Sequence, residues 1–199
     1  MCDACSDSPA DNRRCKGSGS WCHEQTIVNR QREAARHCTH WRQYVGVFHA
    51  LHGRPPRVLD LCCGDGGQVE GAWLLGCTVD GMDLREMPGF PSHPGVTFYV
   101  GDVMELHHEE IRQRFNPDIV VCGPPCQGYS GANRIRGKGF VSIHPKLVIP
   151  IWNMLKPLGV PFYIENVVGS KSDMEQVTPH ILSLCGCRFG LRVFKRRYM

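Results

Sequence analysis

Two short motifs place reactive side chains directly after predicted strands. Gly123-Pro124-Pro125-Cys126-Gln127-Gly128 follows an apolar run, and its prolines fix the backbone so that the Cys126 thiol stays at the strand end. Glu165-Asn166-Val167 follows another apolar run. A carboxyl group at the end of a buried strand can donate a proton, because burial raises its pKa. A structural cysteine sits more comfortably inside an apolar run, so the two motifs indicate chemistry in a shared cleft.

Three acidic strand ends in succession form a second set of candidate ligands. Asp60-Leu61-Cys62-Cys63-Gly64-Asp65-Gly66-Gly67 joins an acid to a glycine-rich turn, whose backbone can approach a ligand closely. Asp83 ends the next strand, where a ribose hydroxyl pair needs an acceptor. Asp102 follows the third strand, where an adenine amino group needs one. Each acid alone is compatible with a helix cap or a turn, but the three together predict a nucleoside ligand.

These motifs require a scaffold that brings several strand ends together. Beyond Pro56, short apolar runs alternate with helical patterns, which predicts an α/β fold with a mostly parallel sheet and helices on both faces. Ligands of such sheets bind at the carboxyl ends of the strands, where every motif above falls. The predicted strands are Val58–Leu61, Thr78–Asp83, Val96–Val100, Asp118–Cys122 and Pro161–Glu165, with strand character again at the end of the chain.

A long helix is predicted ahead of the sheet. Apolar residues recur at spacings of three and four from Glu24 to His52, and Gly53 with Pro55-Pro56 ends the pattern. Residues 24–199 are therefore assigned to one domain. The other predicted helices are Gln68–Gly76, Met104–Phe115, His144–Leu155, in which Pro150 either kinks the helix or marks its start, and Asp173–Leu184.

Composition sets the broad class of protein. A length of 199 residues suits one domain with a buried core, and 42% hydrophobic with 21% charged residues is ordinary for a globular chain. No apolar run is long enough to cross a bilayer, and the N-terminus lacks the apolar segment of a signal peptide, so we expect a cytoplasmic protein that does not bind membranes. A net charge of +4 does not by itself indicate nucleic acid.

The cysteine count is high, at twelve. Without an export signal, thiol chemistry or metal binding is a better interpretation than disulfides. Residues 1–23 are rich in cysteine and polar residues. They are interpreted either as a disordered tail or as a zinc site, for which the candidate ligands are Cys2, Cys5, Cys15, Cys22 and His23. The irregular spacing favours the tail, so no metal is assigned.

The motifs together resemble those of the DNA (cytosine-5) methyltransferase family. Asp-Leu-Cys-Cys-Gly-Asp-Gly-Gly, Pro-Pro-Cys-Gln, Glu-Asn-Val and an arginine-rich terminal strand occur in the order and spacing of that family, from Val58 to Tyr198. The chain looks similar to short forms from phages and mobile elements, which implies a link to restriction-modification. The resemblance implies a Rossmann-like S-adenosylmethionine-dependent methyltransferase fold. It also implies methyl transfer to carbon 5 of cytosine in DNA.

The resemblance assigns catalytic roles residue by residue. Cys126 matches the thiol that adds to carbon 6 of cytosine, and Glu165 matches the acid that holds and protonates nitrogen 3. Asn166 matches the residue that orients this segment, and Arg197 matches an arginine near the cytosine carbonyl. Lys195 stands where the family usually has a second arginine; a lysine keeps the charge but loses the fork geometry.

The resemblance also implies a binding site for S-adenosylmethionine. Asp60, Gly64 and Gly66 match the loop at the methionine end, while Asp83 and Asp102 match the ribose and adenine ligands. Cys62 replaces a residue that is commonly aromatic. The full implied set is Asp60, Leu61, Cys62, Gly64, Gly66, Gly67, Asp83, Leu84, Asp102, Val103 and Pro124.

A glycine-rich segment from Gln127 to Ile143 is predicted to close over nucleic acid. Gln127, Ser130, Arg134, Arg136 and Lys138 are the candidate contacts, although a solvated basic surface is the alternative interpretation. The target cytosine must be single-stranded or flipped out, since a thiol cannot reach carbon 6 inside a duplex. The family's target-recognition region is absent from this sequence, so a recognition partner is one interpretation.

Two alternatives to DNA methylation remain open. One branch of the same family methylates cytosine in transfer RNA with the same Cys and Glu motifs. A catalytically degenerate nucleic-acid-binding subunit would also account for the absent recognition region.

Overall fold

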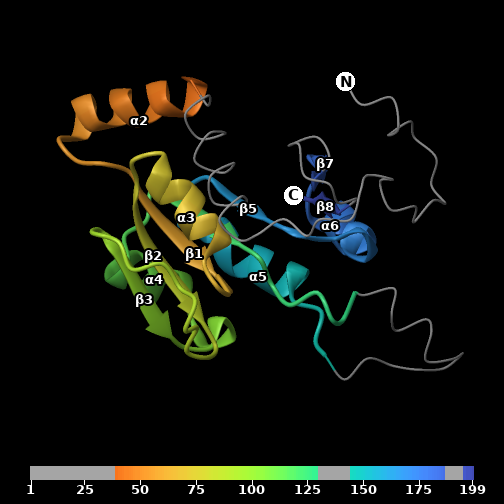
Figure 1. The fold of residues 1–199 in the computed structure, drawn as a ribbon. Coiled ribbons are helices and arrows are strands. Elements are labelled where there is room, and N and C mark those ends of the chain that lie inside the picture. Colours follow the sequence, from red (N-terminus) through yellow and green to blue (C-terminus); the bar gives the residue numbers. More distant parts are fainter. Residues whose placement is uncertain (1–38, 130–143, 187–194) are drawn as a thin grey trace, which may run out of the picture.

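A five-stranded parallel sheet forms the centre of the molecule. The computed structural model describes residues 39–129, 144–186 and 195–199. The strand order is β3-β2-β1-β4-β5, with every neighbouring pair parallel (Figure 1). Reversal of the order at β1 places the carboxyl ends of β1 and β4 side by side at the switch point, where such sheets bind ligands. The strands are β1 (Arg57–Leu61), β2 (Thr78–Asp83), β3 (Val96–Val100), β4 (Ile119–Cys122) and β5 (Phe162–Ile164).

Each face of the sheet packs against its own set of helices, because alternate residues of the buried strands project to opposite sides. Leu59 and Val120 face a core that includes residues of α4 and α5. Val58 and Val121 face a second core with residues of α2 and α3. The predicted α/β class with helices on both faces is therefore confirmed. The helices are α2 (Thr39–His52), α3 (Gly67–Leu74), α4 (His108–Arg114), α5 (Val148–Leu155) and α6 (Lys171–Val177).

A small antiparallel sheet follows directly from β5. Its order is β6-β8-β7, with β6 (Asn166–Val167), β7 (Ser183–Cys185) and β8 (Arg196–Tyr198). In the β6–β8 pair Val167 lies opposite Arg197. Glu165 stands between β5 of the large sheet and β6 of the small one. The small sheet therefore brings the arginine-rich end of the chain to the carboxyl edge of the large sheet.

The boundaries of several elements differ from the sequence prediction for local reasons. The predicted helix over residues 104–115 is two pieces, a 3₁₀ turn Val103–Glu105 capped by Asp102 and then α4. The predicted helix Asp173–Leu184 is wrong in its second half: α6 ends at Val177, because Thr178 precedes a proline and takes an extended conformation. Residues 183–185 form β7 instead.

Two helices agree with the sequence in part. Pro150 lies in the first turn of α5, where no intrahelical bond needs its N–H, so it marks a start rather than a kink. Of the long helix predicted over residues 24–52, the structure describes α2; residues 24–38 lie outside the described part, as does the predicted N-terminal tail 1–23. Short 3₁₀ turns at Lys156–Leu158 and Val168–Ser170 complete the described elements.

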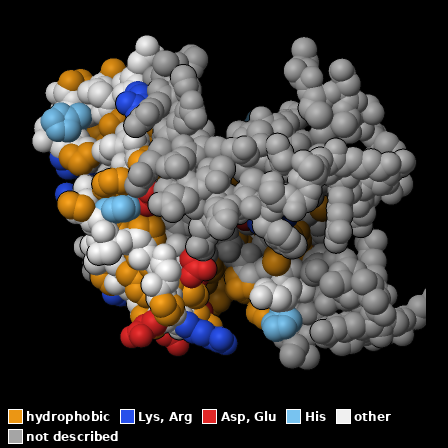
Figure 2. All heavy atoms as spheres, in the orientation of Figure 1, with side chains coloured by type: hydrophobic (Ala, Val, Ile, Leu, Met, Phe, Trp, Pro, Cys, Tyr) orange, Lys and Arg blue, Asp and Glu red, His pale blue; other side chains and the backbone are white. Residues whose placement is uncertain are grey.

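Helix α2 carries several exposed apolar side chains. Leu51 is 76% and Val47 59% exposed. Figure 2 shows hydrophobic side chains there mixed with basic and polar ones. Within the described residues, no helix has both the length and the apolar character that a bilayer crossing requires.

Leu155 tests the core beneath α5. It is 0% exposed, so Leu155→Ala removes buried methyl groups and leaves a cavity. We expect a loss of about 2–5 kcal/mol in the free energy of unfolding, measured by urea denaturation. Leu51→Ala on exposed α2 is the matched control, with an expected change within about 0.5 kcal/mol. Equal losses in the two variants would contradict this packing.

Candidate functional site

One cavity lies at the carboxyl ends of the parallel strands, where the sequence predicts it. Its volume is about 590 Å³, within the range of roughly 300–1,000 Å³ typical of small-molecule sites. The loops after β1, β2, β3, β4 and β5 all contribute to it, and Arg197 enters from β8. Predicted site residues that line it are Cys62, Asp83, Leu84, Asp102, Val103, Pro124, Cys126, Gln127, Glu165, Asn166 and Arg197.

The carboxylate of Asp83 joins the first two loops of the cavity. Its Oδ2 accepts a hydrogen bond from the Gly64 N–H at 2.9 Å, and its Oδ1 accepts from the Leu84 N–H at 2.8 Å. A carboxylate has about four lone-pair sites, so these bonds leave acceptor capacity toward the cavity. Asp83 therefore holds the glycine-rich loop and can still accept hydrogen bonds from a ligand such as a ribose hydroxyl pair.

The loop after β1 turns sharply to keep its backbone near the cavity. Cys62 has φ 57° and Gly66 has φ 80°, both in the left-handed region. A Cβ at Gly66 would lie 2.3 Å from Cδ of Pro91, so glycine is required there for close packing as well as for its backbone angle. Cys62 is the residue of this turn that faces the cavity.

Apolar and polar groups meet at the β2–β3 end of the cavity. Leu84 is 59% and Met104 44% exposed, and both line the cavity beside Asp102. The Oδ1 atom of Asp102 accepts from the Met104 N–H at 2.8 Å, so this acid is the helix cap that the sequence allowed as an alternative. Its place on the cavity wall keeps it available to a ligand too. A planar heterocycle between apolar side chains, with an acid at its edge, matches this end of the site.

Some predicted cofactor residues lie beneath the cavity rather than on its wall. Asp60 and Leu61 are both 0% exposed and are absent from the cavity lining. Burial, together with the negative charge of Asp83, raises the pKa of Asp60 to about 8, and neither of its carboxyl oxygens has a hydrogen-bond partner among the described residues. Gly64, Gly66 and Gly67 shape the loop without lining the cavity. Their predicted ligand roles stay predictions.

Asn166 connects the two motifs that carry the reactive groups. Its side chain is 1% exposed; Nδ2 donates to the Pro124 carbonyl oxygen at 3.0 Å, and Oδ1 accepts from the Val167 N–H at 2.8 Å. The segment that carries Glu165 is thereby tied to the segment that carries Cys126. Cys126 is partly exposed and faces the cavity.

Glu165 and Arg197 form an ion pair inside the cavity. Arg197 Nε lies 2.6 Å from Glu165 Oε1, with side-chain exposures of 27% and 23%. Burial raises the pKa of Glu165 above its ordinary value, while the charges of Arg197 and Lys195 oppose this rise. Lys195 is exposed and does not line the cavity, so within the structure it acts on Glu165 through its charge.

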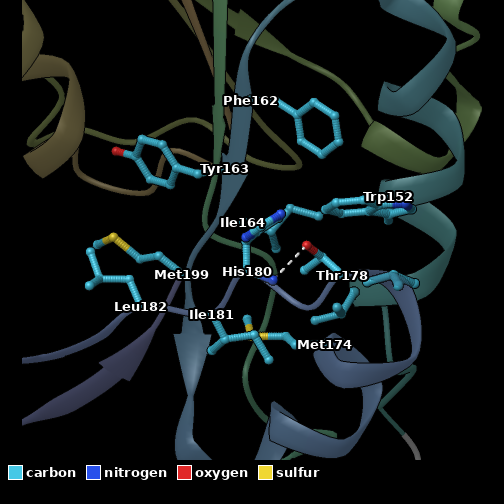
Figure 3. Close-up of a pocket in the computed structure, with 12 residues that line it drawn as sticks. Trp152, Phe162, Tyr163, Ile164, Met174, Thr178, His180, Ile181, Leu182 and Met199 are labelled. Carbon is cyan, nitrogen blue, oxygen red and sulfur yellow. Dashed lines mark hydrogen bonds between the residues drawn. The ribbon is translucent and has the colours of Figure 1, made fainter.

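Two side chains that the sequence analysis missed lie behind this ion pair. The Tyr163 hydroxyl donates to Oε1 of Gln68 at 2.6 Å. The side chains of Gln68 and Glu165 both approach Gly123, because a Cβ at Gly123 would lie 3.2 Å from Gln68 Nε2 and 3.8 Å from Glu165 Oε2. Figure 3 shows that Tyr163 points away from Phe162 and Trp152. A polar residue in the first turn of α3, next to a glycine-rich loop, was the only sequence signal for Gln68.

A second cavity is lined by residues of β5, α5 and α6 and by the segment that follows α6. Its volume is about 630 Å³, and its wall is mainly apolar, with residues of α5, β5 and α6 (Figure 3). Among the described residues that line it, none carries a thiol or a carboxyl side chain. The predicted chemistry therefore belongs to the first cavity.

The remaining predicted residues lie outside the described part of the chain. These are Ser130, Arg134, Arg136 and Lys138 of the glycine-rich segment and the zinc candidates Cys2, Cys5, Cys15, Cys22 and His23. Within residues 39–129, 144–186 and 195–199, no three histidine, cysteine or acidic side chains form a group that could hold a metal.

Comparisons with known proteins find similarity to methyltransferases. The family model described as FtsJ-like methyltransferase matches residues 42–136, a little under half of the chain. Type II methyltransferase M.AgeI of Thalassovita gelatinovora is 24% identical over 165 residues, which cover 71% of this chain and 38% of that protein. This chain thus spans well under half the length of that relative.

Among solved structures, the Entamoeba histolytica methyltransferase EhMeth has a TM-score of 0.50 and 16% identity, and the match covers 72% of this chain and 51% of that one. A mutant of Spodoptera frugiperda DNMT2 has a TM-score of 0.49 and 16% identity, and the match covers 72% of this chain and 48% of that one.

The fold is that of the S-adenosylmethionine-dependent methyltransferases. The predicted fold and cofactor are confirmed at the level of this class. The comparisons do not distinguish the cytosine-5 branch within the class. The FtsJ-like match ends at residue 136, so it includes the predicted cofactor loops and Cys126 but not Glu165 or Arg197.

The ion pair makes a prediction about Glu165. Arg197→Ala removes the closest positive charge that favours the carboxylate, so we expect the pKa of Glu165 to rise further above its ordinary value. Lys195→Ala should produce a smaller rise, since its effect is through charge alone. An NMR titration of the Glu165 side-chain carbon measures both shifts.

A matched control is available at the opposite end of the sheet. Arg54→Ala breaks the pair between Arg54 and Asp118, which lies 2.6 Å away. That variant should leave the pKa of Glu165 unchanged. If Arg197→Ala also leaves it unchanged, Arg197 does not bind Glu165 in solution.

Proposed function

We propose that this chain transfers a methyl group from S-adenosylmethionine to carbon 5 of cytosine in DNA. The observation that carries the proposal is the shared cavity: Cys126, Glu165 and Arg197 line the same space as Asp83 and Asp102. A thiol, a carboxyl group of raised pKa and a guanidinium are the groups that covalent activation of a pyrimidine needs. The sequence resemblance to the cytosine-5 family assigns the same roles to the same three residues.

Carbon 5 of cytosine is a weak nucleophile, so the ring must be activated first. The Cys126 sulfur, as thiolate, adds to carbon 6, and the electron pair of the 5,6 double bond moves toward carbon 4 and nitrogen 3. Glu165 gives its proton to nitrogen 3, which prevents a full negative charge from building on the ring. The product is an enamine whose carbon 5 is nucleophilic. The raised pKa of Glu165 favours the protonated acid that this step requires.

S-adenosylmethionine, when bound, supplies an electrophilic methyl group on a sulfonium. The other groups of the chain bind and orient: Arg197 faces the cytosine carbonyl, and Asn166 holds the Glu165 segment against the Cys126 segment. After methylation, carbon 5 loses its proton to solvent, and the electron pair left on carbon 5 forms the 5,6 double bond as the Cys126 sulfur leaves carbon 6 as a thiolate. Nitrogen 3 returns its proton to Glu165. These steps restore the aromatic ring, the Glu165 acid and the Cys126 thiolate.

The cofactor fits the other end of the cavity on three observations. Asp83 retains acceptor capacity for a ribose, Leu84 and Met104 are exposed apolar groups beside Asp102, and the loop after β1 turns with its backbone near the cavity. Under this proposal Asp83 holds the ribose and Asp102 the adenine amino group. Cys62 and Pro124 contribute the remaining wall.

Product analysis tests the function. Tritiated S-adenosylmethionine is presented with single-stranded DNA, duplex DNA and RNA, each polymer is digested, and the labelled nucleoside is identified by mass spectrometry. We expect label in 5-methyldeoxycytidine from DNA. Cys126→Ser and Glu165→Gln should each lower the rate by at least about 10²-fold, the size typical of a lost nucleophile or acid, while each variant retains cofactor binding.

Other outcomes of this experiment contradict the proposal in different ways. Label only in RNA would assign the same chemistry to transfer RNA or another RNA. Label in no polymer, with cofactor and nucleic acid both bound, would support the degenerate binding subunit. Label at a position other than carbon 5 would remove the role of Cys126.

The ribose contact makes a separate prediction. Asp83→Asn removes a charged acceptor, and hydrogen bonds to charged groups contribute about 1.5–3 kcal/mol, so the Kd for S-adenosylhomocysteine should rise about 10- to 100-fold in calorimetry. Asp80→Asn changes the same residue type on β2 away from the cavity wall and should leave the Kd unchanged. Equal affinities for the wild type and Asp83→Asn would place the ribose elsewhere.

A further inference from the structure

A buried polar contact lies behind the Cys126 segment. The Tyr129 hydroxyl donates to Asp173 Oδ2 at 3.1 Å and accepts from the Val148 N–H at 3.1 Å. Tyr129 is 6% and Asp173 9% exposed. The tyrosine thereby joins the segment after β4 to the first residue of α5 and to α6. Neither Tyr129 nor Asp173 lines the cavity, so the contact cannot act on a substrate directly.

The backbone around Tyr129 leaves the ring little freedom. The Tyr129 N–H donates to the Cys126 carbonyl oxygen at 3.0 Å, which closes a turn from Cys126 to Tyr129. A Cβ at Gly169 would lie 2.0 Å from the Tyr129 carbonyl oxygen, so α6 and its preceding turn approach this backbone as closely as a glycine allows. A Cβ at Gly128 would lie 2.9 Å from the Pro145 carbonyl oxygen. The turn that carries Cys126 is thus packed closely against the backbone of Pro145 and Gly169.

Tyr129 is the donor in its hydrogen bond with Asp173. Burial raises the pKa of Tyr129 to about 12, so its hydroxyl keeps the proton that Asp173 accepts. Lys146 Nζ lies 3.9 Å from Asp173 Oδ1 and 5.4 Å from the centre of the Tyr129 ring, which supplies a cation to the buried acid. Ser172 Oγ also donates to Asp173 Oδ1, at 3.4 Å. Tyr129, Lys146 and Ser172 together hold the Asp173 carboxylate in position.

We propose that Tyr129 and Asp173 are positioning residues for Cys126. The pair holds the turn Cys126–Tyr129 from behind, as Asn166 holds Pro124 from the other end, so that the thiol is presented to the cavity in one orientation. The inference rests on the proposed function, since it assigns no new reaction. Its physical basis is that a displacement of about 1 Å in a reacting group can lower a rate by about 10²-fold.

Single-turnover methyl transfer to DNA, at saturating S-adenosylmethionine, tests the pair. Tyr129→Phe keeps the ring and loses the hydroxyl, and Asp173→Ala removes the acceptor but leaves the bond between Tyr129 and Val148. We expect each variant to lower the single-turnover rate by about tenfold or more, with an unchanged Kd for S-adenosylhomocysteine. Asp173→Asn keeps an acceptor oxygen and should restore most of the rate. The double variant should be no slower than the slower single variant, because the two residues act as one unit.

The controls separate positioning from folding and from the proposed function itself. Tyr44→Phe changes an exposed tyrosine on α2 and should match the wild type. All rates are measured at a temperature at which circular dichroism shows every variant folded. A wild type without activity refutes the proposed function. An active wild type with Tyr129→Phe and Asp173→Ala at the wild-type rate refutes the positioning role, as does a double variant whose losses simply add.

Discussion

The hydrogen bond from Asn166 to the Pro124 carbonyl is the interaction on which the rest of the site depends. It joins two segments that are about forty positions apart in the chain, and it is almost fully buried. One segment presents a thiol and the other a carboxyl group. Both follow paired strands, since β4 and β5 are hydrogen-bonded neighbours and the Glu165 N–H donates to the Cys122 carbonyl oxygen at 2.8 Å. Because the Asn166 amide also accepts from the next backbone N–H, its orientation is set locally before it reaches the proline segment. This side chain therefore adds a second link between the two segments, beyond the pairing of their strands.

Much of this arrangement could be predicted from the sequence because parallel strands leave a strong signal. Two strands have the bounds that the sequence predicts, Thr78–Asp83 and Val96–Val100, because each is a short run flanked by polar or turn-forming residues. The rule that ligands bind at carboxyl ends of strands then places the acids and the thiol at one edge. It does not say which acids reach the surface: Asp60 lies within the sheet and is fully buried, whereas Asp83 lies at the strand end.

Other features depend on tertiary contacts that leave no periodic pattern. The strand β8 is only three residues long. The sequence predicts strand character at the end of the chain, and the resemblance places Arg197 near the cytosine that Glu165 would hold. No residue pattern indicates that β8 pairs with β6 and β7. The predicted helix Asp173–Leu184 is too long because the apolar spacing continues past Thr178. Pro179 disfavours a helical conformation at Thr178, and the observed helix α6 ends at Val177. Tyr129 bonds to Asp173 and Tyr163 bonds to Gln68 across long sequence separations, and only the fold reveals these partners.

The cavity has two ends. The end with Asp83 and Asp102 is built from the loops after β2 and β3, while the end with Glu165 and Arg197 depends on the small sheet and on the ion pair. The central claim is that Cys126 attacks a cytosine held at that second end. The most direct measurement is peptide mapping of the complex formed with S-adenosylmethionine and DNA that contains 5-fluorocytosine, in which the final loss of the carbon 5 substituent is blocked. We expect a covalent DNA adduct on the peptide that contains Cys126; an adduct on any other cysteine, or none while the DNA is bound, would contradict attack by Cys126.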